Sequence, residues 1–303
     1  MYKACIFDLD GTIADTVESI AYVGNKTLRH FGLPEIPVKD YNFYAGNGAD
    51  QLVKNMLQAV PGGDKADYEQ VRSLYRSWFQ ENPLYHVKPF DGILPLLEGL
   101  KEQGVKIAVL SNKPHEAALE VVSSIFGKER FHAVQGQTAR IPRKPSPIGA
   151  LALAESLGVK PEECLYVGDT DTDMDTGHRA GMFTLGVTWG FRPRKELEEH
   201  EADLIVDTPG EILELVKEKR LAGIIFLGGY FSHSEEKLHK LRIPFILSTV
   251  GCAPDGMHHD NYSSLSVDDE KEGYRMTDFL IRQGHEKIAI LAAQPNDASI
   301  GRM

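Results

Sequence analysis

The chain has 303 residues, which suggests about two domains at roughly 150 residues each. Hydrophobic residues make up 42% and charged residues 25%, so the composition is that of a globular protein and excludes a mainly disordered or fibrous chain. The formal charge of −11 argues against a chain-wide nucleic-acid-binding role, because neutralising phosphates requires clustered lysine and arginine. The sequence shows no apolar leader and no apolar run of about 18 residues, so we expect no membrane span and a cytoplasmic location.

The three cysteines, Cys5, Cys164 and Cys252, lie far apart in the sequence. They form neither a Cys-X-X-Cys pair nor a cluster with histidine, which argues against a zinc site or a disulfide framework. Cys5 and Cys164 lie in apolar runs, and we therefore expect them to be small residues of a hydrophobic core.

The first part of the chain begins with one strand and continues as helices. Residues 4–7 (Ala-Cys-Ile-Phe) are apolar on both faces, which is typical of a buried parallel strand. Helical periodicity follows over 15–30, and further helices are predicted at 51–60 and 67–80. Because no convincing strand occurs over 15–84, we interpret this segment as an all-helical insertion.

Strands and helices then alternate. The predicted strands are 106–110, 133–135, 164–167, 183–187 and 204–206. The predicted helices are 93–103, 115–126, 147–157, 172–180 and 209–220. Alternation of elements of this size predicts an α/β fold, with a parallel, Rossmann-like sheet that carries helices on both faces.

The alternation starts again near residue 221. We predict strands at 223–227, 245–247, 265–267 and 287–291, and helices at 234–241 and 269–283. Asp268 is the expected N-cap of the last helix, and Gly284 lies beyond its end.

Four polar stretches follow predicted strands of the first sheet. They are 8–12 (Asp-Leu-Asp-Gly-Thr), 110–113 (Leu-Ser-Asn-Lys), 142–145 (Pro-Arg-Lys-Pro) and 167–173 (Val-Gly-Asp-Thr-Asp-Thr-Asp). In open α/β sheets the ligand crevice lies at the carboxyl ends of the strands. Each stretch alone is ordinary turn, loop or cap sequence, but the ordered set indicates a single site at this edge.

The residue types in these stretches suit a phosphoryl group. Bringing Asp8, Asp10 and Asp169 together is unfavourable unless a cation neutralises them, and Mg²⁺ prefers such oxygen ligands. Lys144 would supply a further positive charge, and Ser111 with nearby backbone amides would donate hydrogen bonds. Positioning and electrostatic stabilisation of this kind dominate phosphoryl transfer.

The spacing of the first two carboxylates supports a covalent mechanism. Asp8 and Asp10 lie two residues apart, so on an extended chain they point to the same side. One can attack phosphorus and form an aspartyl-phosphate while the other handles the proton. We expect Asp171 and Asp175 to be solvated or capping residues, and Asp173 either supports the site or caps a helix.

Residues 1 to about 218 resemble the haloacid dehalogenase superfamily of phosphotransferases. The four motifs of that superfamily occur in order, as Phe7-Asp8-Leu9-Asp10-Gly11-Thr12, Ser111-Asn112-Lys113, Lys144 and Gly168-Asp169 with Asp173. The resemblance implies a catalytic core over 1–14 and 85–218. It also implies that the helical insertion over 15–84 is a cap that closes over substrate.

The resemblance also implies roles for individual residues. Asp8 would be the nucleophile and Asp10 the general acid and base. Phosphate would be bound by Ser111, Asn112 and Lys144. Mg²⁺ would be held by Asp8, the backbone carbonyl of Asp10, and Asp169.

Within this superfamily the chain most resembles phosphoglycolate phosphatases. The resemblance lies in residues 44–49 of the cap (Tyr-Ala-Gly-Asn-Gly-Ala) and in 187–192 (Val-Thr-Trp-Gly-Phe-Arg). It implies a small phosphorylated substrate, with 2-phosphoglycolate as the first candidate, and substrate contacts at Gly46 and Asn47. The alternative for these two residues is a turn between helices. Relatives that hydrolyse pyrophosphate or isomerise sugar phosphates share the four motifs, so a pyrophosphatase and a sugar-phosphate mutase remain alternatives.

Residues 221–303 resemble part of the effector-binding domain of lac-repressor-type regulators, a periplasmic-binding-protein-like fold. The resemblance lies in 222–226 (Ala-Gly-Ile-Ile-Phe), 243–247 (Ile-Pro-Phe-Ile-Leu) and 284–289 (Gly-His-Glu-Lys-Ile-Ala). The DNA-binding helices and most of the other lobe are absent, so a remnant of a gene fusion or frameshift is favoured over a dedicated function. A sugar-binding or assembly role, including a homodimer through this segment, is the alternative. His258-His259-Asp260 fits a solvated turn better than a metal site.

Overall fold

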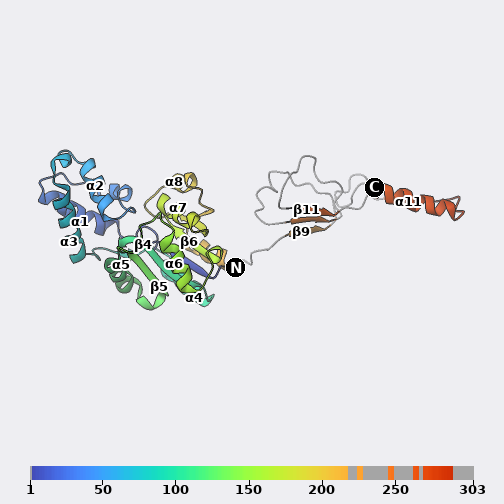
Figure 1. Cartoon of the computed structure of the whole chain (residues 1–303), viewed down its shortest axis with the longest axis horizontal. Coiled ribbons are helices and arrows are strands. Elements are labelled where there is room, and N and C mark those ends of the chain that lie inside the picture. The colour runs from blue at the N-terminus through green and yellow to red at the C-terminus, as the bar shows by residue number, and fades with distance from the viewer. Residues whose placement is uncertain (1, 218–223, 228–244, 249–261, 266–268, 289–303) are drawn as a thin grey trace. The chain divides into compact units, whose positions relative to one another are not determined.

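The computed structural model describes residues 2–217, 224–227, 245–248, 262–265 and 269–288 (Figure 1). The chain forms two compact units, residues 1–219 and 220–303. Within the described part of the chain, no helix is long and apolar enough to cross a membrane.

A parallel sheet forms the centre of the first unit. The strands of this unit are β1 (Ala4–Phe7), β2 (Ala14–Asp15), β3 (Lys88–Pro89), β4 (Lys106–Pro114), β5 (Ala133–Gln137), β6 (Cys164–Gly168), β7 (Phe183–Val187) and β8 (Leu204–Val206). Six of them pair in parallel in the order β5-β4-β1-β6-β7-β8. The chain builds one side of the sheet and then crosses β1 to build the other, which places the topological switch point beside β1.

Helices cover both faces of this sheet. The helices of the first unit are α1 (Val17–His30), α2 (Ala49–Ala59), α3 (Tyr68–Glu81), α4 (Ile93–Glu102), α5 (His115–Val121), α6 (Ile148–Leu157), α7 (Asp171–Arg179), α8 (Arg194–Glu199) and α9 (Pro209–Lys217). One face packs against α4, α5 and α9, and the opposite face packs against α6 and the end of α7. The predicted α/β sheet with helices on both faces is confirmed.

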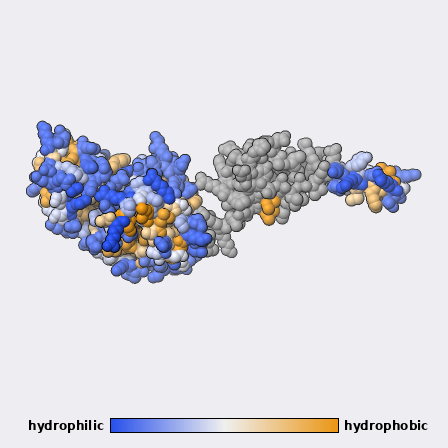
Figure 2. All heavy atoms as spheres, viewed as in Figure 1, coloured by the Kyte–Doolittle hydropathy of each residue, from blue (hydrophilic) through white to orange (hydrophobic). Residues whose placement is uncertain are grey.

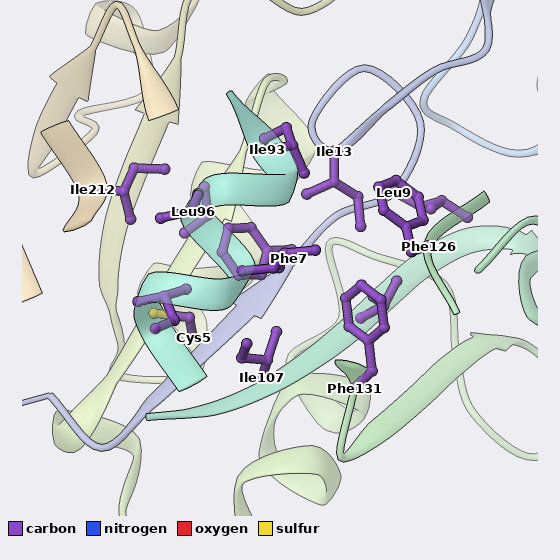
Figure 3. Packing of buried hydrophobic residues seen from close by; sticks show 14 of the residues in the cluster. Cys5, Phe7, Leu9, Ile13, Ile93, Leu96, Ile107, Phe126, Phe131 and Ile212 are labelled. Carbon is purple, nitrogen blue, oxygen red and sulfur yellow. The ribbon is translucent and has the colours of Figure 1, made fainter. Parts of the chain in front are cut away.

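The alternation of side chains along β1 fixes the carboxyl edge of the sheet. Cys5 and Phe7 enter one hydrophobic cluster, whereas Ala4 and Ile6 enter the cluster on the opposite face. Figure 3 shows Phe7 inside the first cluster, with Leu96 of α4 beside it. Burial of a large apolar side chain contributes about 1.5–3 kcal/mol. Packing on both faces therefore holds β1 in place, and this fixes the position of Asp8 directly after the strand.

The helical segment α1–α3 forms a lobe of its own beside the sheet (Figure 1). A separate cluster of buried side chains holds it together, including Val23, Tyr41, Met56 and Val71. The two-residue strands β2 and β3 pair antiparallel where the chain enters and leaves this lobe. Residue 15 of β2 falls inside the segment for which we predict no strand, because two residues are too few to show an alternating pattern.

Other differences from the predicted elements are local. β4 continues to Pro114 with a register shift after Leu110, so Ser111, Asn112 and Lys113 belong to the strand rather than following it. Lys144 lies in the loop after β5 and not directly at a strand end. The helix predicted over 115–126 ends as a π-helical turn, and α8 is too short for a clear periodic signal.

The second unit contains a small parallel sheet and one helix among its described residues. Strands β9 (Ile224–Leu227), β10 (Phe245–Ser248) and β11 (Tyr262–Leu265) pair in the order β11-β10-β9, and α11 spans Asp269–Arg282. Figure 2 shows hydrophobic side chains on the surface of α11, where Tyr274, Met276, Phe279 and Ile281 are exposed. These short elements do not single out the effector-binding fold that we expect there. The predicted helix 234–241, Cys252, the turn at His258 and the Asp268 cap lie outside the described residues.

Candidate active site

Three carboxylates meet at the carboxyl edge of the sheet. Asp8 directly follows β1, and its backbone amide donates a hydrogen bond to Val167 in β6 at 2.9 Å. Asp169 directly follows β6, and Asp173 lies in the first turn of α7. One carboxylate oxygen from each of the three lies within 4.8 Å of the others, and all three residues are buried. The structure thus brings together Asp8 and Asp169, as the sequence pattern predicts.

Lys144 joins this group as its counter-charge. Its ammonium nitrogen lies 2.7 Å from Oδ1 of Asp8 and 2.7 Å from Oδ1 of Asp173. Asp173 also accepts hydrogen bonds from the Thr170 hydroxyl at 2.7 Å and from the Thr170 backbone amide at 3.2 Å, and so completes the capping box at the start of α7, whose N-cap is Thr170. Both interpretations of Asp173 therefore apply at once, since the same carboxylate caps the helix and pairs with the lysine.

Asp169 is held by residues from two distant segments. Its oxygens accept hydrogen bonds from the Thr12 hydroxyl and from the Phe191 backbone amide, each at 2.7 Å. Gly11 has φ of +87°, and a Cβ built on it would lie 2.3 Å from Oδ2 of Asp169. The sequence pattern contains Thr12 but gives it no role, and nothing local marks Phe191 as a partner of the site.

The site buries three carboxylates and one ammonium close together, and this shifts the pKa values of these groups. Burial, with Asp173 and Asp169 nearby, raises the pKa of Asp8 well above its usual value. Burial and Asp173 raise the pKa of Asp169 to about 7. Burial alone would lower the pKa of Lys144, but Asp173 and Asp8 raise it well above its usual value. One ammonium cannot balance three carboxylates, so the geometry favours a bound cation.

The donor atoms fit a hard divalent cation such as Mg²⁺. Oxygen ligands suit this hard cation, which binds through one or two carboxylates and keeps waters for a phosphate to replace. Oδ1 of Asp8 is buried and makes no hydrogen bond of good geometry, although the Lys144 ammonium is near, so it can still act as a ligand. The Asp8 and Asp169 carboxylates are the residues that would hold the ion.

Asp10 lies apart from this trio of carboxylates. Both of its oxygens accept hydrogen bonds from the Lys113 ammonium, at 2.7 and 3.0 Å. The carboxylate of Asp10 therefore lies beside a second, separate lysine and is not a member of the group of Asp8, Asp169 and Asp173. Lys113 occurs in the second motif, but the sequence pattern assigns it no function.

The remaining predicted phosphate ligands differ in how their side chains are used. The Ser111 hydroxyl accepts a hydrogen bond from the Lys113 amide and lines the cavity described below. The Asn112 side chain donates to the backbone carbonyls of Gly46 and Lys144 and accepts from the Lys144 amide. Asn112 thus links the cap to the loop that carries Lys144. Because its side chain is used in these contacts, only its backbone is free to contact a phosphate.

A cavity of about 800 Å³ lies between the sheet edge and the helical lobe. Its floor contains Asp8, Asp10, Ser111, Asn112 and Lys113. Its opposite wall comes from the helical lobe and includes Ile20, Gly46, Leu52, Tyr75, Arg76 and Phe79. This is the space in which a small substrate would meet both the buried carboxylates and the cap.

Of the two cap residues that we expect to contact substrate, one lines the cavity and the other contacts α7. Gly46 lines the cavity, whereas Asn47 does not belong to the lining among the described residues. Oδ1 of Asn47 accepts a hydrogen bond from the Thr172 hydroxyl of α7 at 2.8 Å. Asn47 therefore holds the cap against the core at this position, and it contacts α7 instead of the cavity.

An ion pair between cap and core was not predicted from the sequence. Asp50 of α2 pairs with Arg143, beside Lys144, at 3.0 Å and with Arg76 of α3 at 2.5 Å. Burial would raise the pKa of Asp50, but the two arginines hold it below its usual value. Arg192 adds a second bridge, donating to the Ala45 backbone carbonyl at 3.0 Å. Such contacts depend on how the cap sits on the core, for which no local sequence signal exists.

Comparison with known proteins agrees with this geometry. The family model described as haloacid dehalogenase-like hydrolase matches residues 5–187. A phosphoglycolate phosphatase of Aquifex aeolicus is 34% identical over 214 residues, 71% of this chain and 96% of that protein. A phosphoglycolate phosphatase of Thiobacillus denitrificans is 28% identical over 71% of this chain and 95% of its own length. A crystal structure from Haemophilus somnus, described as a predicted phosphoglycolate phosphatase, has a TM-score of 0.67 and 25% identity, and the match covers 71% of this chain and 98% of that one.

Proposed function

This chain belongs to the haloacid dehalogenase-like hydrolases and is a phosphatase, and we propose that it hydrolyses 2-phosphoglycolate with the help of Mg²⁺ through an aspartyl-phosphate on Asp8. The observation that carries the proposal is the buried group of Asp8, Asp169 and Asp173 around Lys144, which opens onto the cavity through Asp8. We assign the catalytic core to residues 1–14 and 85–218 and the cap to 15–84.

In the first step Asp8 acts as the nucleophile. A carboxylate oxygen of Asp8 attacks phosphorus in line with the ester oxygen, a phosphorus–oxygen bond to Asp8 forms, and the bond to the ester oxygen breaks. Asp10, which lines the same cavity, gives a proton to the departing alkoxide, and glycolate leaves. The pairing of Asp10 with Lys113 fixes the direction in which that carboxylate faces.

In the second step Asp10 works as a base. It takes a proton from water, the water oxygen attacks phosphorus, and the bond to Asp8 breaks to release inorganic phosphate. Lys144 stays beside Asp8 throughout, and with the Ser111 hydroxyl it balances charge on the transferring oxygens. Mg²⁺, when bound by Asp8, Asp169 and the backbone carbonyl of Asp10, would neutralise the clustered carboxylates and polarise the phosphoryl oxygens.

The substrate assignment rests on the named relatives and on the cavity. The Aquifex aeolicus and Thiobacillus denitrificans relatives are phosphoglycolate phosphatases, and the match covers nearly their full length. A cavity of about 800 Å³ has room for a small phosphate ester, and its wall brings apolar cap residues over the carboxylates.

Phosphate release from a panel of esters and from pyrophosphate tests the proposal. We expect release from 2-phosphoglycolate that requires Mg²⁺, stops with EDTA and is lost in Asp8→Asn. The matched control is Asp175→Asn, because Asp175 is paired with Arg179 and His200 at the surface of α7 and does not line the cavity. A folded Asp8→Asn protein with normal activity would refute the mechanism. Preferential release from pyrophosphate would refute the substrate, and return of the phosphoryl group to a sugar would indicate a mutase.

Residues 220–303 lie outside the part of the chain that the family model matches, residues 5–187. We propose, on the three parallel strands and the sequence resemblance, that this unit is a fragment of an effector-binding domain of lac-repressor type. The exposed apolar side chains of α11 would make it a candidate surface for homodimer formation. We also propose that the enzyme acts in the cytoplasm on a small metabolite and not on nucleic acid or membranes, which fits its free buried cysteines, Cys5 and Cys164.

A further inference from the structure

Lys113 is a buried cation whose only part in the phosphoryl steps described above is to orient Asp10. Its side chain is 4% exposed, and it lines the cavity beside Ser111 and Asn112. Lys144, by contrast, already balances Asp8 and Asp173 and does not belong to the lining among the described residues. Burying an ammonium is costly unless a partner of opposite charge lies close, so a lysine facing a ligand cavity selects for anions.

The surroundings of Lys113 leave room for one more partner. In the described part of the chain, its ammonium donates to the two oxygens of Asp10, at 2.7 and 3.0 Å. An ammonium has three donors, so one N–H is left for a ligand. On the cap side the nitrogen lies 4.8 Å from the centre of the Phe79 ring, a cation–π contact that holds the side chain between core and cap.

The position of Lys113 relative to Asp10 defines which anion fits. Asp10 must reach the ester oxygen to protonate it, at about 2.6–3.2 Å. In 2-phosphoglycolate a single methylene carbon separates that ester oxygen from the carboxylate. A cation that touches Asp10 is therefore placed beside the substrate carboxylate. We propose that Lys113 is the specificity-determining residue of this enzyme, binding a carboxylate bonded directly to the carbon that carries the ester oxygen, an inference that rests on the proposed function.

Two other basic side chains line the cavity among the described residues, and both are less suited to this task. Arg76 is paired with Asp50 at 2.5 Å, and its side chain is 46% exposed. His115 also lines the cavity, but its Nδ1 already accepts a hydrogen bond from the Gly136 amide at 3.1 Å. Lys113 is buried, has an N–H left to donate and contacts Asp10, whereas Arg76 and His115 do not combine these three properties.

Steady-state kinetics on a matched pair of esters tests the proposal. Ethyl phosphate carries a methyl group where 2-phosphoglycolate carries its carboxylate. We expect Lys113→Met to lower the ratio of the two kcat/KM values about 100-fold, because 2-phosphoglycolate loses a buried charged partner that ethyl phosphate never had. Lys113→Arg should retain most of the ratio, and Arg76→Met should keep it. A loss that is equal for both esters, or a ratio that collapses in Arg76→Met and not in Lys113→Met, overturns the proposal.

A binding measurement separates this proposal from the proposed function. Calorimetric titration of 2-phosphoglycolate into Asp8→Asn with Mg²⁺ needs no turnover, and we expect the additional Lys113→Met change to weaken binding about 100-fold. Unchanged binding overturns the role of Lys113 even if 2-phosphoglycolate is the substrate. Weakened binding without hydrolysis in the wild type supports Lys113 and refutes the substrate. Lys113→Gln provides the same test if Lys113→Met does not fold, as judged by circular dichroism.

Discussion

The sheet edge and the cap contribute to the same cavity in different ways. At the sheet edge, Asp8, Asp169 and Lys144 are buried and linked by contacts of 2.7 Å with Asp173 and Thr12. The cap supplies mainly apolar walls, and it meets the core through a few separate polar contacts, among them Asp50 with Arg143, Asn47 with Thr172 and Ala45 with Arg192. The chemical step therefore depends on buried charges that are linked to one another. Substrate selection and closure of the cap depend on separate contacts, and each of these can be changed by a single substitution.

Lys144→Met should have the largest effect. It leaves the buried carboxylates of Asp8 and Asp173 without their counter-ion, which costs about 3–5 kcal/mol of stability in comparable buried pairs. We expect kcat/KM for 2-phosphoglycolate to fall about 1,000-fold or more, measured by phosphate release on protein that is shown to be folded. Lys101→Met, on the exposed end of α4, is the control. A decrease in kcat/KM of less than tenfold would contradict the expectation that catalysis depends on the charge of Lys144.

Metal removal should destabilise the edge in a pH-dependent manner. The pKa values of Asp8 and Asp169 are raised in the folded state, Asp169 to about 7, against about 3.9 in the unfolded chain. The folded state therefore binds more protons than the unfolded state above pH 4, and the metal-free protein loses stability as pH rises toward 7. Mg²⁺ should raise Tm more at pH 7.5 than at pH 5, as measured by thermal melts with Mg²⁺ or EDTA.

Two variants identify the source of that stabilisation. Asp169→Asn should lose most of the Mg²⁺-dependent rise in Tm, while Asp175→Asn should keep it. If Mg²⁺ raises Tm equally at both pH values, or if Asp169→Asn responds like the wild type, the carboxylate group is not the metal site.

Weakening the cap bridge should have a moderate effect on substrate capture. Arg143→Met removes one of the two arginines on Asp50, a partly exposed pair worth about 0–1 kcal/mol. We expect KM for 2-phosphoglycolate to rise about fivefold while kcat changes little, because closure is affected and the edge is not. The Asp50→Asn/Arg143→Met double variant should be no worse than the sum of its parts, and Arg179→Met on α7 is the matched control. A kcat that falls as much as KM rises would place Arg143 in the chemistry.

Removal of the second unit should have the smallest effect. The chain over residues 1–219 forms a compact unit, and the Haemophilus somnus structure, matched over 98% of its length, covers only 71% of this chain. We expect residues 1–219 to keep kcat/KM within about twofold, and gel filtration of both proteins to report whether the second unit alone causes self-association. Loss of activity on truncation would show that the second unit supports the active site.

The features that sequence reasoning predicts are those fixed by regular periodicity and by topology. The apolar runs of β1 and β6 indicate buried parallel strands, and the rule for open sheets then brings Asp8 and Asp169 to one edge. The pairing of Asp10 with Lys113 could not be predicted, because it depends on side-chain direction in an irregular part of β4. The Asp50–Arg143 bridge depends on how the cap sits on the core, and neither residue has a local pattern that identifies its partner.

The most direct test of the central claim is capture of the covalent intermediate on Asp8. The protein is mixed with ³²P-labelled 2-phosphoglycolate and Mg²⁺, and acid quenches the reaction within milliseconds. The account predicts label on the protein that neutral hydroxylamine removes, as expected for an acyl phosphate, and that is absent from Asp8→Asn and present in Asp175→Asn. Rapid phosphate release with no protein-bound label at any time, or label that persists in Asp8→Asn, would contradict the account.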